Sequence, residues 1–118
     1  MKTALVVDDD KDIRDMLSVA LSAEGWLVQT TDTLLGAISI LTQKNDIHCM
    51  LLDYNLPGMP MEDFLRQVRG FAPSLGVILV SALDTVAEKA EKYKISFYLG
   101  KPIDFDELRK AMNACCAP

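Results

Sequence analysis

The stretch that decides the fold is TALVVDDD, residues Thr3–Asp10. A short apolar run that ends abruptly in acids is typical of a buried strand that stops at the edge of a sheet. Four further apolar runs occur along the chain, and the five together predict strands at Thr3–Val7, Leu27–Thr31, His48–Leu52, Gly76–Val80 and Ser96–Leu99.

Segments whose apolar residues recur at helical spacing follow these runs. Gly25 stands where the first such segment should end, and Asp32 or Thr33 can cap the second. The five predicted helices cover Asp12–Glu24, Thr33–Gln43, Met61–Arg69, Thr85–Tyr93 and Asp104–Cys116.

Buried strands that alternate with helices indicate a parallel sheet covered on both faces. Right-handed crossovers then give a doubly wound, three-layer α/β fold. The chain has 118 residues, half of them hydrophobic. We therefore expect one domain over residues 1–118, with a core that needs neither disulfides nor a structural metal.

Composition limits which binding partners and which cellular location we expect for this chain. The net charge of −5 disfavours direct binding of nucleic acid, because phosphates attract clusters of Lys and Arg. The apolar runs are shorter than the ~20 residues of a membrane span, and the chain does not open like a signal peptide. Three cysteines, with Cys115 next to Cys116, form no disulfide framework and fit a reducing cytoplasm.

Polar residues follow four of the predicted strands. In doubly wound sheets the ligand site lies outside the carboxyl ends of the strands, where this chain places Asp8, Asp9, Asp10, Asp53, Ser81 and Lys101. Clustered carboxylates repel one another and suit Mg²⁺, with Mn²⁺ as a substitute. A lysine and a hydroxyl beside them suit a phosphoryl group, and an aspartate can act as the nucleophile that accepts it.

Four motifs in this order resemble those of the receiver domains of two-component response regulators. They are LVVDDD at Leu5–Asp10, LLDYNLPGM at Leu51–Met59, VSA at Val80–Ala82 and YLGKP at Tyr98–Pro102. The resemblance covers essentially the whole chain, and the size is close to that of the single-domain chemotaxis regulators. It implies a flavodoxin-like sheet with strand order 2-1-3-4-5.

The resemblance also implies a role for individual residues. Asp53 is the expected phosphoacceptor, and Lys101 is the expected cation that contacts the phosphoryl group. Ser81 and Tyr98 are the expected switch residues. The expected Mg²⁺ ligands are Asp8, Asp9, Asp53 and the backbone carbonyl of Asn55, and the Lys101–Pro102 bond is expected to be cis.

The function implied is that of a phosphorylation-controlled binding module, not an enzyme in the ordinary sense. A histidine kinase or a histidine phosphotransfer protein is the expected phosphodonor, and the chain is expected to catalyse its own phosphorylation and dephosphorylation. The surface of the fourth helix, fifth strand and fifth helix is expected to change and to be recognised by a downstream protein. If the chain is complete, its output must be a protein–protein contact.

Three stretches depart from the family pattern. Pro60-Met61 replaces a common acid–glycine pair, which implies different packing near the site. The segment Lys94–Phe97 lacks the usual Gly-Ala step, so Phe97 is expected to form an apolar spot on the output face. The stretch from Ser81 to Lys101 is slightly shorter than usual, which predicts a short or irregular fourth helix.

Other functions remain open from the sequence alone. A haloacid-dehalogenase-type phosphatase also uses an Asp nucleophile and Mg²⁺, but it needs a second acid where this chain has Asn55. A flavodoxin-like cofactor carrier would place a phosphate-binding loop where this chain has the acids Asp8–Asp10. A receiver domain cut from a longer regulator, with a DNA-binding or enzymatic output domain, is a third alternative.

Several residues have a plainer interpretation. We expect Asp10 to be a surface residue, and Asp12 to cap the first helix. The alternative for Ser81 is a helix cap in place of a switch residue. The alternative for Tyr98 is an ordinary half-buried aromatic. His48 is expected at the edge opposite the site. Cys49 is expected in the core, Met50, Met59, Met61 and Met112 in packing roles, and Cys115-Cys116 at an ordinary helix end.

Overall fold

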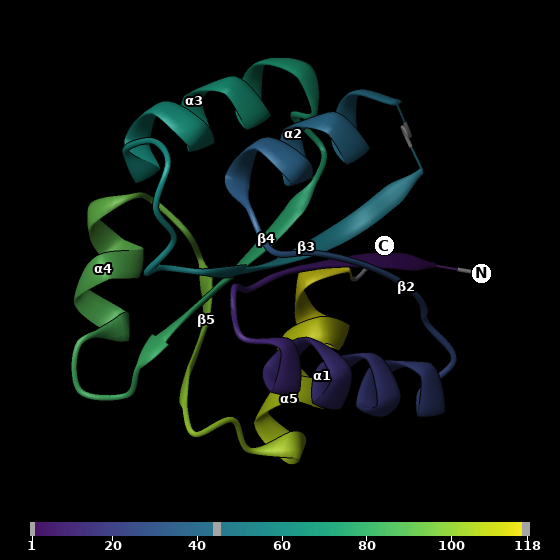
Figure 1. Cartoon of the computed structure of the whole chain (residues 1–118). Coiled ribbons are helices and arrows are strands. Elements are labelled where there is room, and N and C mark those ends of the chain that lie inside the picture. The colour runs from purple at the N-terminus through teal and green to yellow at the C-terminus, as the bar shows by residue number, and fades with distance from the viewer. Residues whose placement is uncertain (1, 44–45, 117–118) are drawn as a thin grey trace.

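Five parallel strands form one sheet in the order β2-β1-β3-β4-β5 (Figure 1), which confirms the predicted doubly wound fold. The computed structural model describes residues 2–43 and 46–116. The strands are β1 (Thr3–Val7), β2 (Leu27–Thr31), β3 (Ile47–Asp53), β4 (Gly76–Ala82) and β5 (Phe97–Lys101). The helices are α1 (Lys11–Ala23), α2 (Leu34–Gln43), α3 (Met61–Phe71), α4 (Val86–Lys92) and α5 (Phe105–Cys115).

The predicted elements all occur: β1 and β2 have the predicted bounds, and the ends of the other elements shift by at most two residues. The largest difference is β5, which begins at Phe97 and includes Lys101, so this lysine belongs to the strand that it was expected to follow. Helix α4 has seven residues, which confirms the prediction of a short fourth helix. The Lys101–Pro102 bond is cis, also as expected.

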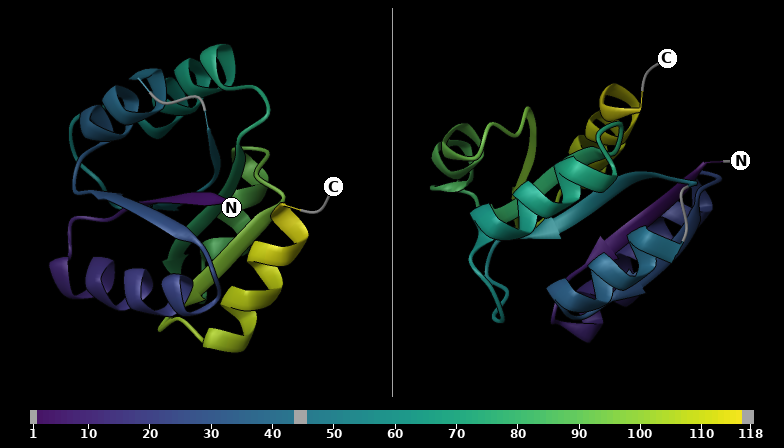
Figure 2. Two further views of the ribbon diagram at one scale, coloured as in Figure 1. Left: turned by 90° about the vertical axis from the view of Figure 1, so that its right-hand side faces the viewer. Right: turned by 90° about the horizontal axis from the view of Figure 1, so that it is seen from above.

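Helices cover the sheet on both faces (Figures 1 and 2). Helices α1 and α5 lie on one face, and α2, α3 and α4 lie on the other. Each face has its own hydrophobic core. The core under α1 and α5 includes Leu17, Leu21, Leu108 and Met112, whereas the core under the other three helices includes Leu34, Phe64, Val68 and Val86.

The central strand β3 supplies both cores because successive side chains of a strand point to opposite faces. Met50 and Leu52 enter the core under α2 and α3. Cys49 and Leu51 enter the core under α1 and α5. All four are at most 1% exposed, which explains why the sequence of this strand is an unbroken apolar run.

Local capping fixes where α1 begins and ends. Asp10 caps α1, because its carboxylate accepts hydrogen bonds from the backbone N–H groups of Asp12 and Ile13. The expectation that Asp12 caps this helix is therefore wrong, since the helix already begins at Lys11. Gly25, just beyond α1, has a φ of 91°, a conformation that glycine adopts without steric cost.

The expected position of His48 is confirmed, and that of Phe97 is wrong. His48 lies at the start of β3, where its Nδ1 accepts a hydrogen bond from the N–H of Thr3 at 3.1 Å. This confirms its place at the edge opposite the acids. Phe97 does not form an apolar spot on the output face: it packs, partly buried, against the core under α1 and α5. The strand alternation that buries Leu99 on this face turns Phe97 the same way.

The methionines have the expected packing roles. Met50, Met61 and Met112 are buried, and Met59 packs partly buried against the core. Within the described residues, no helix is both long enough and apolar enough to cross a membrane.

Substitution of two leucines, one buried and one exposed, tests how strongly the stability of the core depends on helix packing. Leu65 on α3 is 1% exposed, whereas Leu35 on α2 is 68% exposed. We expect Leu65→Ala to lower the free energy of unfolding by about 2–5 kcal/mol, because it leaves a cavity under α3. Leu35→Ala should change it by less than about 0.5 kcal/mol. Urea denaturation followed by circular dichroism measures both, and equal losses would contradict this assignment of the core.

Candidate functional site

Three carboxylates meet at the carboxyl edge of the sheet. Asp8 and Asp9 directly follow β1, and Asp53 is the last residue of β3. One carboxylate oxygen from each lies within 4.8 Å of the others. Asp8 and Asp53 are only 2% and 3% exposed, whereas Asp9 is exposed. The parallel register of β1 with β3 produces this cluster, since Val7 pairs with Leu52, one residue before Asp53.

Lys101 brings the only ammonium group that bonds to these acids within the described part of the chain. Its Nζ lies 3.2 Å from Oδ1 of Asp53 and 3.4 Å from Oδ2 of Asp8. The lysine stands at the end of β5, two strands away from β3, and its long side chain crosses the end of β4. The site therefore forms only when all of the central strands are in register.

Asp8 is held in place by its own loop. Its Oδ1 accepts a hydrogen bond from the N–H of Asp10 at 2.9 Å. Its backbone carbonyl accepts one from Nη1 of Arg14 at 2.8 Å. Arg14 lies one turn into α1 and was not recognised from the sequence, because nothing in its spacing distinguishes it from an arginine on a solvated helix face.

Burial and charge act on the ionisation of these groups. Burial raises the pKa of Asp53, the negative charge of Asp8 raises it further, and Lys101 opposes both. Burial on its own lowers the pKa of Lys101, but the charges of Asp53 and Asp8 outweigh this and raise the pKa above its ordinary value. Asp53 is therefore a carboxylate whose negative charge is incompletely balanced.

The donor set fits a divalent cation of the hard class. Three carboxylates share one ammonium, so the edge of the sheet carries excess negative charge. Mg²⁺ prefers oxygen ligands and binds proteins through a small number of carboxylates. The incompletely balanced charge on Asp53 is the observation that favours such an ion here.

Ser81 lies beside this cluster but is bonded elsewhere. It is the sixth residue of β4 and is 1% exposed, so the alternative that it caps a helix is wrong. Its Oγ accepts a hydrogen bond from Nζ of Lys89, on α4, at 3.1 Å. The same ammonium lies 4.1 Å from the centre of the Tyr54 ring, within the range of a cation–π interaction.

Lys89 is therefore a residue of the site that sequence analysis missed. The charged residues of the fourth helix looked generic in the sequence, and only the folded chain shows that one of them turns inward. Because Tyr54 directly follows Asp53, the ammonium of Lys89 links the loop after β3 to the hydroxyl on β4.

The two remaining predicted residues are on the surface. Tyr98, in β5, is 47% exposed and so points away from the core. Asn55 is exposed in the loop two residues after Asp53, and its backbone acts to lower the pKa of the Asp53 carboxyl group. Their predicted roles as a switch and as a carbonyl ligand stay predictions.

A family model described as the response regulator receiver domain matches residues 4–113. The chain therefore belongs to this family, as its motifs predicted. It is a receiver domain of the two-component signalling type, a class of signalling modules, and its predicted fold is the fold of that family.

The proteins that this chain is similar to in sequence differ in length. The chain is 34% identical over 115 residues to the probable transcriptional regulatory protein TcrX of Mycobacterium tuberculosis; the match covers 95% of this chain and 48% of TcrX. It is 31% identical over 112 residues to sporulation initiation phosphotransferase F of Bacillus subtilis, covering 92% of this chain and 89% of that protein. The chain thus spans about half of some relatives and most of others.

Solved structures agree with this fold. A response regulator receiver domain protein from Clostridium thermocellum has a TM-score of 0.86 and 25% identity, and the match covers 98% of this chain and 94% of that one. The response regulator TrrA from Thermotoga maritima, solved in complex with Mg²⁺-BeF, has a TM-score of 0.85 and 25% identity, with 98% and 99% covered.

The repulsion around Asp53 predicts a pH-dependent stability. The raised pKa means that folded Asp53 holds its proton more tightly than unfolded Asp53 does. The contribution of Asp53 to the free energy of unfolding is fully present below the ordinary Asp pKa of about 3.9. It is lost as the pH rises through the raised pKa of the folded state. In Mg²⁺-free buffer at about pH 7, Asp53→Asn should therefore raise the unfolding temperature, and the gain should shrink toward acid pH.

Thermal unfolding at several pH values, with chelator present, measures this effect. Asp84→Asn is the matched control, because Asp84 is exposed in the loop before α4, and it should leave the unfolding temperature unchanged at every pH. A lower unfolding temperature for Asp53→Asn near neutral pH would contradict the charge balance described for the site.

Proposed function

We propose that this chain is the phosphoacceptor receiver of a two-component or phosphorelay system and that Asp53 carries the phosphoryl group. One observation supports this above the others: a buried Asp53 carboxylate lies beside one ammonium, that of Lys101, and two further carboxylates, those of Asp8 and Asp9. A nucleophile, a cation for the transferred group and the ligands for a metal thus meet at one edge of the sheet.

The proposed reaction transfers a phosphoryl group from a phosphohistidine. An Asp53 oxygen attacks phosphorus, the bond from phosphorus to the histidine nitrogen breaks, and an acyl phosphate forms. Lys101 neutralises charge on the transferred group, and the Ser81 hydroxyl donates a hydrogen bond to it. Water later hydrolyses the acyl phosphate, so the chain catalyses both its loading and its release.

Asp8, Asp9 and Asp53 are the residues that would hold Mg²⁺, with the backbone carbonyl of Asn55 as a further ligand and Mn²⁺ as a substitute ion. When bound, the ion neutralises negative charge on the transferred group. The Mg²⁺-BeF complex of the TrrA relative supports this assignment. Lys101 remains the protein's own cation at the nucleophile.

The switch begins at Ser81. In the structure its hydroxyl oxygen accepts a hydrogen bond from Lys89, which holds the side chain toward α4. We propose that this bond is lost when Ser81 turns its O–H toward a phosphoryl group. Only Val86 and Ala90 of α4 are buried, so this helix can shift at low cost. We propose that release of Lys89, with inward rotation of Tyr98, changes the surface formed by α4, β5 and α5, and that a partner protein binds this surface.

The partners follow from this chemistry. The donor is a histidine kinase or a histidine phosphotransfer protein, and the acceptor of the signal is a downstream protein, with no direct role for nucleic acid or membrane. We propose that residues 1–118 act as one receiver domain in the cytoplasm. The 48% coverage of TcrX supports the alternative that such a receiver belongs to a longer transcriptional regulator.

Phosphorylation by a small phosphodonor tests the proposed function. With acetyl phosphate and Mg²⁺, intact mass should show a single phosphate adduct on the chain, and the adduct should be absent from Asp53→Asn. Asp10→Asn is the matched control: Asp10 caps α1 with its side chain, which Asn does equally well, so this variant should be phosphorylated normally. Failure of the unaltered chain to form an adduct at saturating donor would refute the proposal.

The bond between Lys89 and Ser81 predicts a variant that is easier to activate. Lys89→Ala removes the hydrogen bond that holds the Ser81 side chain toward α4, so the competent state should be more populated and beryllofluoride with Mg²⁺ should bind more tightly, by about 3- to 10-fold. Lys92→Ala is the control, because Lys92 lies over the Tyr93 ring at 5.3 Å and not at the site. Titration calorimetry measures both, and weaker binding by Lys89→Ala would mean that Lys89 supports the active state.

A further inference from the structure

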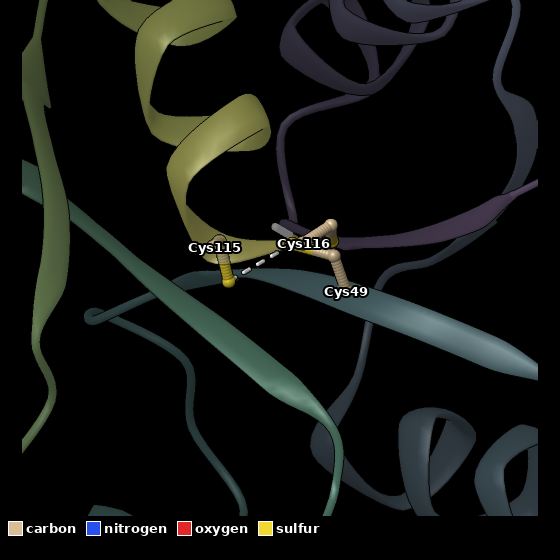
Figure 3. A group of neighbouring side chains, drawn as sticks. All are labelled: Cys49, Cys115 and Cys116. Atoms are coloured by element: carbon tan, nitrogen blue, oxygen red, sulfur yellow. Dashed lines mark hydrogen bonds between the residues drawn. The ribbon is translucent and has the colours of Figure 1, made fainter. Parts of the chain in front are cut away.

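Three thiols gather at the end of β3 that lies farthest from Asp53 (Figure 3). Cys49 is fully buried in β3, while Cys115 and Cys116, at the end of α5, are partly buried. The sulfurs of Cys49 and Cys115 are 3.7 Å apart, and all three sulfurs lie within 4.8 Å of one another. The sequence predicted an ordinary helix end here, because nothing in it shows that α5 ends against Cys49.

Gly76 is what allows Cys115 to approach the sheet. It is the first residue of β4 and pairs in register with Cys49. A Cβ atom at Gly76 would collide with the Cys115 sulfur. The absence of a side chain at this position therefore creates the space in which the Cys115 sulfur lies beside that of Cys49.

The distance between sulfurs matches metal coordination better than a disulfide. Zinc–sulfur bonds of about 2.3 Å in a tetrahedron place two sulfurs about 3.8 Å apart, which agrees with the observed 3.7 Å. A disulfide requires about 2.05 Å. The sulfurs of Cys49 and Cys115 are thus spaced as two ligands of one ion, and the sulfur of Cys116 lies within 4.8 Å of both.

The protonation of the thiols is also suited to a cation. The Cys49 thiol donates toward Cys115, and its hydrogen bonds with Cys115 and Cys116 and its burial raise its pKa. The bond with Cys49 lowers the pKa of Cys115. A separate interaction with Cys49, with help from the nearby charge of Lys2, lowers the pKa of Cys116 to about 7. Because the thiolate is the form of cysteine that binds metal ions, the lowered pKa values of Cys115 and Cys116 are compatible with a role as ligands.

We propose that Cys49, Cys115 and Cys116 form a binding site for a thiophilic divalent cation of the Zn²⁺ class. Binding forms three metal–sulfur bonds and releases to solvent each proton that the thiols still hold. Water fills the fourth position, because Cys115 and Cys116 are partly exposed. The three thiolates and the ion carry one net negative charge, near the Lys2 ammonium, which donates to the Cys116 carbonyl at 2.6 Å.

Such an ion would join the end of α5 to β3. The helix is part of the surface that we propose changes on phosphorylation, but the thiol site uses none of the acids around Asp53. Hard oxygen ligands at one end of β3 and soft sulfur ligands at the other would select different metals.

Cobalt(II), whose thiolate complexes absorb in the near ultraviolet, is the probe for this site. Titration of the reduced chain in oxygen-free buffer should give a sulfur-to-cobalt charge-transfer band that saturates at one equivalent, and Zn²⁺ should abolish it. Zn²⁺ should also protect Cys115 and Cys116 of the unaltered chain from alkylation, as read by intact mass. Absence of the band, or alkylation unaffected by Zn²⁺, would overturn the proposal.

Variants locate the site. Cys115→Ser and Cys116→Ser should each weaken cobalt binding by at least about 100-fold, since loss of a ligand should exceed the 10- to 100-fold effect of an outer partner. Gly76→Ala keeps all three thiols but displaces Cys115, and it should weaken binding as well. Asp53→Asn should leave the band unchanged. A band that survives Cys115→Ser would show that the metal binds elsewhere.

Discussion

The contacts of Lys101 with Asp8 and Asp53 are the interactions on which the rest of this structure depends, because they offset the repulsion between two buried carboxylates. Two carboxylates that are almost inaccessible to water lie close together, and one ammonium contacts both. A fold that buried these acids without the lysine would be strongly destabilised. The sheet order is what makes the arrangement possible, because it places β1 and β3 side by side and lets the side chain from β5 reach them.

The same balance is consistent with the proposed chemistry of the site. The single ammonium leaves negative charge over, which favours a divalent cation, and such a cation would offset the charge of a phosphoryl group transferred to Asp53. The hydroxyl of Ser81 meanwhile accepts a hydrogen bond from Lys89, on α4, a helix of seven residues with two buried side chains. This bond connects the edge that carries the acids to α4, which is the connection that the proposed switch would use.

The sequence was sufficient to predict what depends on local pattern and on the rules of parallel sheets. Apolar runs predict the strands, and the rule that ligands bind at the carboxyl ends of parallel strands predicts that Asp8, Asp53 and Lys101 lie together. It was insufficient where a contact depends on side-chain direction. Lys89 is one of several similar charged residues on α4, and only the packed helix shows that it turns toward Ser81. Phe97 was misplaced for the same reason, since its side chain points to the same face of β5 as that of Leu99 and so toward the core under α1 and α5.

The alternation of side chains along β3 has an evolutionary consequence. Cys49 and Leu51 belong to one core and Met50 and Leu52 to the other, and Asp53 ends the same strand. Insertion or deletion of one residue within this strand would exchange the two sets between the cores and turn the terminal carboxylate away from its partners. Lineages can therefore vary the side chains of this strand gradually, but its length can hardly drift by single steps, whereas the loops that connect the strands remain free to lengthen or shorten.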